Sequence, residues 1–289
     1  MEFLKTVKEV VFLGPAGSYS EMAKDVFCKY YNLNVKETPL PTISEAIEYV
    51  NNSENVIGVI PVENSIEGAV REAIDSLIKT NNNNLQYLAE YPLPIRHCLL
   101  SKNTDIKKIK GLISHPQAIA QCLNFIHKNL PSDIDIIRAT STANAAKSLE
   151  KYGLEYGAIG SSKTAELYNL NILKSNINDD PTNQTRFVLL GKFKTPRTGN
   201  DKTSLAFSTI NESGALLKVL EIFEKYNINL YYIDSRPSKV KFGEYTFLVD
   251  FDGHYTDEII SKALKEIREK SSYFRLVGSY EKLSNIDLL

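Results

Sequence analysis

The sequence contains no tryptophan, only two methionines and four histidines, and no more than three cysteines. Cys28, Cys98 and Cys122 lie far apart and have none of the close spacings of a zinc site or a disulfide framework. We therefore expect reduced, partly buried thiols, which are usual in the cytoplasm. No apolar run approaches the roughly 18 residues that a membrane-spanning helix needs, and residues 1–9 lack the apolar core of a signal peptide. These absences predict a cytoplasmic protein without a membrane partner.

An excess of charge of either sign is also missing, because 34 basic residues face 35 acidic ones and leave a formal net charge of -1. This balance creates no strong field that would attract nucleic acid, so a nucleic-acid partner is not expected. The hydrophobic share of 43% and the charged share of 24% are those of an ordinary globular protein. At roughly 150 residues per domain, the chain is long enough for about two domains.

Continuous apolar runs alternate with helix-like segments in the first two thirds of the sequence. The runs cover residues 10–13, 56–60, 111–114, 134–137 and 156–160. Such runs are typical of strands that are covered on both faces of a mainly parallel sheet. We therefore predict a doubly wound α/β domain whose ligand lies beyond the carboxyl ends of its strands.

Helix starts and one helical face can also be read in this part of the sequence. Residues 119–126 carry apolar side chains at the spacing of a single helix face. Ser18 with Glu21, and Thr42 with Glu45, have the spacing of capping boxes, which begin helices.

The pattern changes after a polar segment that contains proline and glycine, residues 192–202, which we interpret as a linker. Strands are predicted at 203–209, 230–235, 245–251 and 273–280, and helix faces at 216–223 and 260–267. The order βαββαβ is the ferredoxin-like arrangement. The predicted organisation is a catalytic domain at 8–191, the linker, and a second domain at 203–282.

Five segments place polar side chains where predicted strands end and helices begin. They cover residues 14–21, 61–68, 115–122, 141–146 and 183–187. Helix starts bind anions through free N–H groups, and an arginine can pair bidentately with a carboxylate. Each segment alone also has an ordinary explanation: a tight turn, a polar loop, a capping histidine, a plain N-cap and a surface arginine.

Together and in this order, the five segments closely resemble the prephenate dehydratase family. The matching runs are GPAGSYSE at 14–21, PVENSIEG at 61–68, HPQAIAQC at 115–122, STANAA at 141–146 and TRF at 185–187. The resemblance extends from about Val10 to Tyr280. It implies a two-lobed catalytic domain like a type II periplasmic binding protein, with the substrate in the cleft between two subdomains. The last domain resembles the ACT regulatory domain, with GAL at 214–216 and DSRP at 234–237, where Asp234 replaces the family's usual Glu.

The resemblance implies that the substrate is prephenate, which loses carbon dioxide and water to give phenylpyruvate in phenylalanine biosynthesis. No cofactor and no metal are implied. The implied catalytic residues are Thr185, Glu63, Asn64 and Ser65. Thr185 would hydrogen-bond the departing hydroxyl, and a proton relay through Glu63 or a water molecule stays open.

The implied substrate-binding residues are Ser18, Gln117, Ser141, Thr142, Arg186 and Phe187. Arg186 and the N–H groups after Ser141 would hold the carboxylates, and Phe187 would pack the site. Because one carboxylate leaves as carbon dioxide, the strongest grip is expected on the pyruvyl carboxylate that remains.

The ACT resemblance implies that L-phenylalanine binds between paired domains as an allosteric effector, in a homodimer or homotetramer. The implied effector-binding residues are Gly214, Ala215, Leu216, Asn229, Leu230, Asp234 and Ser235. Two alternatives remain: an arogenate or broad cyclohexadienyl dehydratase, and, ranked well behind, a binding protein that senses amino acids without catalysis.

Overall fold

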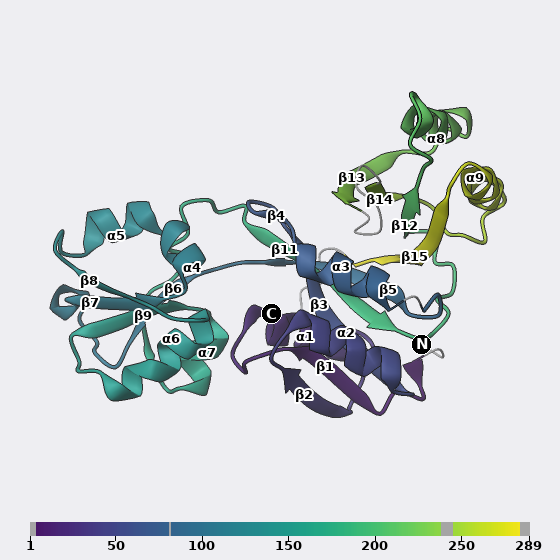
Figure 1. Cartoon of the computed structure of the whole chain (residues 1–289). Coiled ribbons are helices and arrows are strands. Elements are labelled where there is room, and N and C mark those ends of the chain that lie inside the picture. Colours follow the sequence, from purple (N-terminus) through teal and green to yellow (C-terminus); the bar gives the residue numbers. More distant parts are fainter. Residues whose placement is uncertain (1–3, 81, 238–244, 284–289) are drawn as a thin grey trace.

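Two β-sheets organise the protein, whose computed structural model describes residues 4–80, 82–237 and 245–283 (Figure 1). The larger sheet has ten strands and runs through the first lobe and the C-terminal domain. The smaller sheet has five strands and forms the second lobe. The fold is therefore mixed α/β.

The first lobe is built on one half of the larger sheet. Its elements are β1 (Glu9–Leu13), α1 (Tyr19–Tyr30), β2 (Lys36–Leu40), α2 (Ile43–Asn52), β3 (Val56–Asn64), β4 (Gly68–Ala69), α3 (Arg71–Lys79), β5 (Gln86–Pro94) and the returning strand β11 (Gln184–Gly191). Helix α1 covers one face of the sheet, whereas α2 and α3 cover the other. Val10 and Val11 are fully buried in these two different cores, which confirms that the first apolar run is covered on both faces.

The strand directions differ from the expected mainly parallel sheet. Strand β1 is parallel to β2 and β3, but β11 is antiparallel to both β3 and β5. The difference arises because β11 comes from the second lobe rather than from a crossover helix. Both helix starts are confirmed as N-caps: the Ser18 side chain accepts the N–H of Glu21, and the Thr42 side chain accepts the N–H of Glu45. The return bonds differ from those of a capping box, because the Glu21 carboxylate accepts the N–H of Gly17 and the Glu45 carboxylate accepts the hydroxyl of Thr42.

The second lobe follows the first after Pro94. Its elements are β6 (Cys98–Ser101), the 3-10 helix Ile106–Lys108, β7 (Gly111–Ser114), α4 (Pro116–Ala120), α5 (Leu123–Asn129), β8 (Asp135–Arg138), α6 (Thr142–Ser148), the 3-10 helix Leu149–Lys151, β9 (Tyr156–Gly160), α7 (Ser162–Leu167) and β10 (Asn171–Lys174). The strand order is β10-β6-β9-β7-β8. The chain crosses between the lobes twice, before β6 and before β11 (Figure 1).

One expectation for the second lobe was wrong, and another is confirmed only in part. The apolar run 134–137 was expected to be buried, but β8 is an edge strand on which Asp135, Ile136 and Arg138 are exposed. Ile119, Cys122 and Ile126 pack in one core as the helical face predicts, but Leu123 is exposed and the helix is interrupted between α4 and α5. The break follows from Asp179, whose N–H donates to the carbonyl of Gln121 and whose carboxylate accepts the N–H of Asn124.

The C-terminal domain has the predicted order of strands and helices. Its elements are β12 (Asp201–Ser208), α8 (Ala215–Lys225), β13 (Leu230–Pro237), β14 (Tyr245–Asp252), α9 (Glu258–Glu269) and β15 (Tyr273–Lys282). Both helices pack on one face of its strands around Phe207, Phe223 and Phe251. The first strand begins at Asp201, inside the segment that was interpreted as a linker.

The C-terminal domain is joined to the first lobe through a shared sheet and a shared core. Only Glu281–Ala89 and Lys282–Glu90 pair β15 with β5. A Cβ on Gly278 would collide with the backbone of Tyr87 at this close approach.

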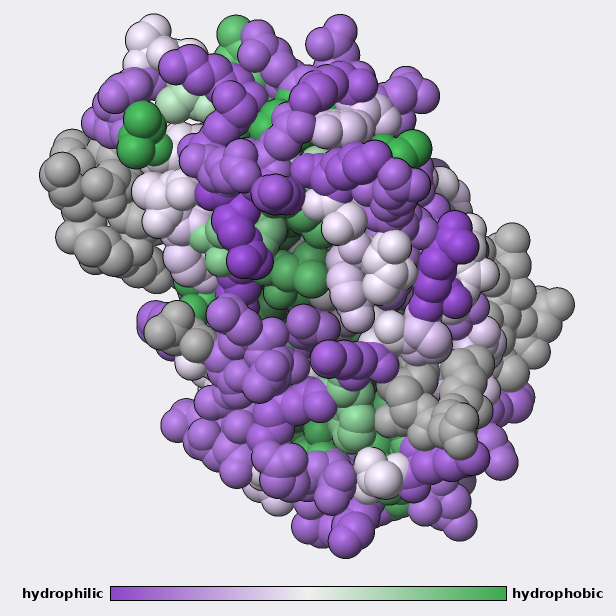
Figure 2. Space-filling view, turned by 90° about the vertical axis from the view of Figure 1, so that its right-hand side faces the viewer, coloured by the Kyte–Doolittle hydropathy of each residue, from purple (hydrophilic) through white to green (hydrophobic). Residues whose placement is uncertain are grey.

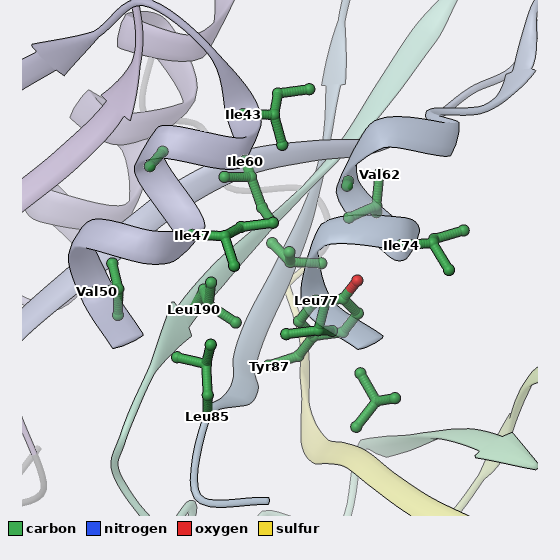
Figure 3. Packing of buried hydrophobic residues seen from close by; sticks show 14 of the residues in the cluster. Ile43, Ile47, Val50, Ile60, Val62, Ile74, Leu77, Leu85, Tyr87 and Leu190 are labelled. Carbon is green, nitrogen blue, oxygen red and sulfur yellow. The ribbon is translucent and has the colours of Figure 1, made fainter. Parts of the chain in front are cut away.

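Beyond that narrow join, the sheet face opposite α8 and α9 contributes residues such as Ala206 and Leu248 to the core of the first lobe. Figure 3 shows part of this core, where Ile47 from α2, Leu77 from α3 and Leu190 from β11 gather.

Arg275 of β15 connects the C-terminal domain to the end of α3 by hydrogen bonds. It is 1% exposed and donates hydrogen bonds to four carbonyl oxygens, those of Leu77, Ile78, Asn82 and Leu85. Carbonyl groups at a helix C-terminus lack partners within the helix and favour a nearby cation. A buried side chain of the C-terminal domain therefore supplies hydrogen-bond donors to the carbonyl groups at and just after the end of α3 in the first lobe.

The outer surface is mostly hydrophilic on the face shown in Figure 2, where hydrophobic residues are confined to small areas between hydrophilic ones. Among the described residues, no helix has both the length and the apolar character needed to cross a lipid bilayer.

Candidate active site

A cavity of about 290 Å³ lies between the two lobes. It begins where β1 ends in the first lobe and where β7 and β8 end in the second, so the starts of α1, α4 and α6 border it. The residues that line this interlobe cavity are Leu13, Gly14, Pro15, Ser18, Tyr19, Ser20, Pro61, Asn64, Ile95, His97, His115, Gln117, Ala118, Gln121, Thr140, Ser141, Thr142 and Thr185. Its place at carboxyl strand ends is where open α/β sheets bind ligands.

Asn64 and Thr185 form a fixed pair on the floor of the cavity. They are directly opposite each other on β3 and β11. The side-chain oxygen of Asn64 accepts the N–H groups of Ile66 and Glu67, so its amide nitrogen must face the other way. That nitrogen lies 3.0 Å from Thr185 Oγ1. Because Thr185 Oγ1 accepts from Asn64, its own O–H is available to donate into the cavity.

Further hydrogen bonds extend from Asn64 along both chain crossings. Asn64 Nδ2 lies 2.9 Å from Asn183 Oδ1, and Asn183 Nδ2 lies 3.0 Å from Gln121 Oε1. Gln121 Oε1 is 3.2 Å from His97 Nε2, and His97 Nδ1 is 3.0 Å from the hydroxyl of Tyr19. This chain of side chains connects the first lobe, the second lobe and both crossings, so the floor of the cavity is held from several elements at once.

Helix N-termini supply the positive potential of the cavity. Ser18 caps α1 and Ser141 caps α6, each accepting an N–H from its own helix. The other first-turn N–H groups have no partner within the helix and carry the positive end of its dipole. No lysine, arginine, aspartate or glutamate is among the described residues that line the cavity.

Burial sets the protonation of His97, which is 3% exposed. Desolvation lowers the pKa of His97 from 6.5 to about 4, against an opposing effect of its hydrogen bond to Gln121. His97 is therefore a neutral imidazole near pH 7. Desolvation also raises the pKa of Tyr19 well above its ordinary value, so Tyr19 stays protonated.

Among the described residues, no group of three or more His, Cys, Asp or Glu side chains is arranged to hold a metal ion. The groups that face the cavity are hydroxyls, amides and imidazoles, which suit a polar organic ligand.

Comparison with known proteins agrees with this geometry. A family model described as prephenate dehydratase matches residues 10–195. A Methanocaldococcus jannaschii protein named prephenate dehydratase is 40% identical over 279 residues, which cover 94% of this chain and 98% of that protein. The chain belongs to the prephenate dehydratase family.

Other relatives cover the C-terminal part as well. A crystal structure titled as a prephenate dehydratase from Arthrobacter aurescens in complex with L-Phe superposes with a TM-score of 0.85 at 31% identity, covering 95% of this chain and 90% of that one. An Arabidopsis thaliana protein named arogenate dehydratase/prephenate dehydratase 2, chloroplastic, is 35% identical over 286 residues, covering 94% of this chain and 72% of that protein.

The cavity of this prephenate dehydratase family member brings together six of the residues singled out from the sequence. Three helix-start residues, Ser18, Ser141 and Thr142, line it together with Gln117 of α4. Asn64 and Thr185 complete the set from the first lobe. Residues from all five distant segments therefore share one cavity.

Arg186, Glu63, Ser65 and Phe187 are not among the residues that line the cavity, and their contacts with substrate stay predictions. Side chains alternate along a strand, and Arg186 and Glu63 follow and precede the cavity-facing residues Thr185 and Asn64. Ser65 Oγ accepts the N–H of Gln184 and clamps the end of β3 to β11. Phe187 is 2% exposed and packs in the core beneath α1.

Arg186 is bound to carboxylates instead of being available for a ligand. Its guanidinium lies 3.1 Å from Glu63 Oε2, 3.1 Å from Glu90 Oε2 and 2.8 Å from Asp250 Oδ2. Burial disfavours the charged guanidinium, but Asp250, with Tyr280 and the two glutamates, raises the pKa of Arg186 above its ordinary value. Arg186 is therefore a fully charged residue on the far side of β11.

The residues implied in effector binding are divided between separate places in the C-terminal domain. Gly214, Ala215 and Leu216 border a hollow at the start of α8, and Asn229 borders another beyond its end. Leu230, Asp234 and Ser235 lie on β13, the outermost strand of the sheet.

Sequence reasoning assigned no role to Tyr19, His97, Gln121 or Asn183. Tyr19, Gln121 and Asn183 lie inside the segments that were singled out, so the segments indicated the region of these residues without indicating their roles. His97 follows a strand and a proline, and nothing in its sequence surroundings indicates that it lies at a crossing between lobes.

We expect the nuclear magnetic resonance signals of His97 to stay those of a neutral imidazole from pH 8 down to about pH 5, because burial lowers its pKa to about 4. Histidine-labelled protein and the variant His97→Gln would assign the signals among the four histidines. Since the unfolded chain binds this proton near pH 6.5, this residue makes the fold less stable as the pH falls from 6.5 toward 4. A midpoint near 6.5 in the folded protein would contradict the assignment.

Proposed function

We propose that the protein converts prephenate to phenylpyruvate, carbon dioxide and water in the interlobe cavity. The observation that supports this proposal most directly is the orientation of the Thr185 hydroxyl. Asn64 occupies an acceptor site of Thr185 Oγ1 at 3.0 Å, and two backbone N–H groups fix the Asn64 amide. Thr185 is thus prepared to donate a hydrogen bond to an oxygen that gains negative charge.

The reaction needs such a donor. As the ring carboxylate leaves as carbon dioxide, the electron pair of the broken C–C bond enters the ring, and the C–O bond at the opposite carbon breaks. The departing hydroxide takes up one proton to become water. Thr185 would stabilise the developing charge on that oxygen by hydrogen bonding, which acts most strongly in the transition state. A threonine hydroxyl is too weak an acid to give up its own proton.

The absence of cationic side chains among the described lining residues also fits decarboxylation. A cation paired with the departing carboxylate would stabilise the ground state and slow its loss. The starts of α1 and α6 offer weaker, directional N–H donors. We assign these donors to the pyruvyl carboxylate, which keeps its charge throughout the reaction.

Prephenate is preferred here over arogenate because of charge. Arogenate carries an ammonium group in place of the keto oxygen. No acidic side chain is among the described residues that line the cavity, so a buried ammonium would lack an ionic partner. The amides of Gln117 and Gln121 can instead donate to a keto oxygen.

We further propose that the C-terminal domain is an ACT domain that binds L-phenylalanine between two copies and regulates the enzyme. Helix α8 has 11 residues and is about 16 Å long at 1.5 Å per residue. Gly214 and Asn229 lie beyond its opposite ends, so one copy does not bring them together. Two copies related by a two-fold axis would place the Gly214 end of one beside the Asn229 end of the other. The relative from Arthrobacter aurescens, solved with L-Phe, supports this proposal.

The outer strand β13 is the surface that we propose for this pairing. It lies at the edge of the sheet, and Tyr231 and Ile233 on it are 51% and 48% exposed. Unpaired edge strands with exposed apolar side chains favour association. The resulting assembly would be a homodimer, or a homotetramer formed from two such pairs.

We expect Thr185→Ala to lower kcat by about 100-fold or more, with a much smaller change in KM, because the hydrogen bond is strongest in the transition state. Phenylpyruvate formed from prephenate is measured by its ultraviolet absorbance. Thr185→Ser keeps the hydroxyl and serves as the control that retains most of the activity. Unchanged turnover by the alanine variant would remove Thr185 from the mechanism.

We expect the wild-type protein to show a higher kcat/KM for prephenate than for arogenate, because the cavity offers no partner for an ammonium group. Both substrates are assayed in parallel, with phenylpyruvate and phenylalanine as the respective products. Equal or better use of arogenate would assign the protein to the arogenate dehydratases.

We expect Ile233→Glu to convert the assembly into monomers and to abolish inhibition by L-phenylalanine, because a charge at the edge strand opposes pairing. Light scattering after size exclusion gives the mass, and the prephenate assay with added L-phenylalanine gives the inhibition. The control is Leu154→Glu in the second lobe, where the apolar side chain is 58% exposed against 48% for Ile233. A variant that remains paired would place the interface elsewhere.

A further inference from the structure

A cluster of five charged side chains lies on the face of the first-lobe sheet opposite the interlobe cavity. Its members, the Arg186 cluster, are Arg186, Glu63, Glu90, Lys202 and Asp250. Glu90 and Asp250 are 5% and 1% exposed. Buried carboxylates persist only when cations or hydrogen-bond donors compensate them. Three carboxylates here share two cations, so each cation is bound on several sides.

The contacts of the cluster are short and cross a domain boundary. Lys202 Nζ lies 2.6 Å from Glu90 Oε1, while Arg186 Nη1 lies 3.1 Å from Glu90 Oε2. Asp250 Oδ1 accepts the hydroxyl of Ser204 at 2.5 Å. Its other oxygen lies 2.8 Å from Arg186 as an ion contact that lacks the alignment of a hydrogen bond. Lys202 and Asp250 belong to the C-terminal domain, whereas Arg186, Glu63 and Glu90 belong to the first lobe.

Sheet pairing alone does not bring Asp250 to Arg186. Four strand intervals separate β14 from β11 in the shared sheet, which would span about 19 Å in a flat sheet. The 2.8 Å contact exists because the C-terminal strands fold back over the first lobe beyond the narrow β15–β5 join. The contact therefore depends on how the C-terminal domain sits on the lobe.

The cluster also adjoins the catalytic pair through the backbone. Arg186 and Glu63 are opposite each other on β11 and β3, one position from the opposed pair Thr185 and Asn64. The register between the strands shifts immediately after Arg186, and such bulges bend a strand and re-aim its side chains. A displacement of the guanidinium would move the Thr185 hydroxyl relative to the substrate.

We propose that Asp250 is a positioning residue for catalysis, which holds Thr185 in place through Arg186 and makes turnover depend on the seating of the C-terminal domain. The inference rests on the proposed dehydratase function. The same contact would link effector binding in the C-terminal domain to the geometry of the interlobe cavity. Asp250 is paired with Tyr232 of β13, whose ring centroid lies 5.9 Å from the Arg186 guanidinium carbon. A shift of β13 on effector binding would change the Asp250–Arg186 contact.

The decisive variant is Asp250→Asn in the full chain, which keeps an acceptor for Ser204 and removes the charge that faces Arg186. We expect kcat for prephenate to fall about tenfold, with KM changed by less than about twofold, because the cavity surface itself is intact. L-phenylalanine should still bind, as measured by calorimetry, but its maximal inhibition should be reduced. Asp250→Glu restores the charge and should recover part of the lost kcat.

Glu266→Gln is the matched control, because Glu266 forms its ion pair with Lys225 between α8 and α9, away from the first lobe. It should match the wild type in kcat and inhibition. If circular dichroism shows that Asp250→Asn does not fold, the same measurements are made on Lys202→Gln. This variant removes the other charge that the C-terminal domain contributes to the cluster. It should lower kcat and weaken inhibition in the same sense.

A folded Asp250→Asn or Lys202→Gln protein with wild-type kcat and full inhibition would overturn the coupling. So would an equal loss in Glu266→Gln. Wild-type protein that forms no phenylpyruvate would count against the proposed function itself, and is thereby distinguished from a failure of the coupling alone.

Discussion

The alternation of side chains along β3 and β11 is the constraint on which the rest of this structure depends. Thr185 faces Asn64 on the side of the cavity, and Arg186 faces Glu63 one position further on. Because neighbouring residues of a strand point to opposite faces, a hydroxyl–amide pair and an ion pair are built from adjacent positions of the same two strands. One face borders the interlobe cavity and the other contacts the C-terminal domain.

The position of this strand pair explains why the geometry of the cavity depends on how the two lobes are placed. Strand β11 is the segment that returns from the second lobe, and the two crossings carry His97 and Asn183. Hydrogen bonds run from Thr185 through Asn64, Asn183 and Gln121 to His97. A change in the angle between the lobes would therefore act directly on the floor of the cavity, where the hydroxyl is oriented.

Much of the fold and about half of the candidate site could be predicted from the sequence. Capping boxes and apolar runs act over a few residues, so the starts of α1 and α2 and the strands β1 and β3 were recognisable. The split between α4 and α5 was not, because Asp179, distant in the sequence, causes it. The joining of the C-terminal domain to the first lobe was not recognisable for the same reason, because the pairing of β15 with β5 is a long-range contact.

Arg186 is a residue for which motif resemblance and strand periodicity give different expectations. Motif resemblance treats Thr185, Arg186 and Phe187 as a single unit that faces the substrate. Strand periodicity allows only alternate members of the run to face one way. Once Thr185 was assigned to the cavity, Arg186 had to face elsewhere, although its partner Asp250 was not recognisable without the fold.

The chemistry of the two inter-domain contacts differs in what it can transmit. The apolar core shared by β11 and the C-terminal strands is non-directional, so small sliding of the domain costs little apolar contact. Replacement of a buried ion cluster by apolar groups is often neutral for stability, so stability alone gives little reason for charges at this join. The Asp250–Arg186 contact joins a single pair of groups at 2.8 Å, so it depends on one particular placement of the domain on the lobe. In the proposed coupling, Asp250 is therefore the group by which the placement of the C-terminal domain acts on β11, and Arg186 is the cation of the strand that it contacts.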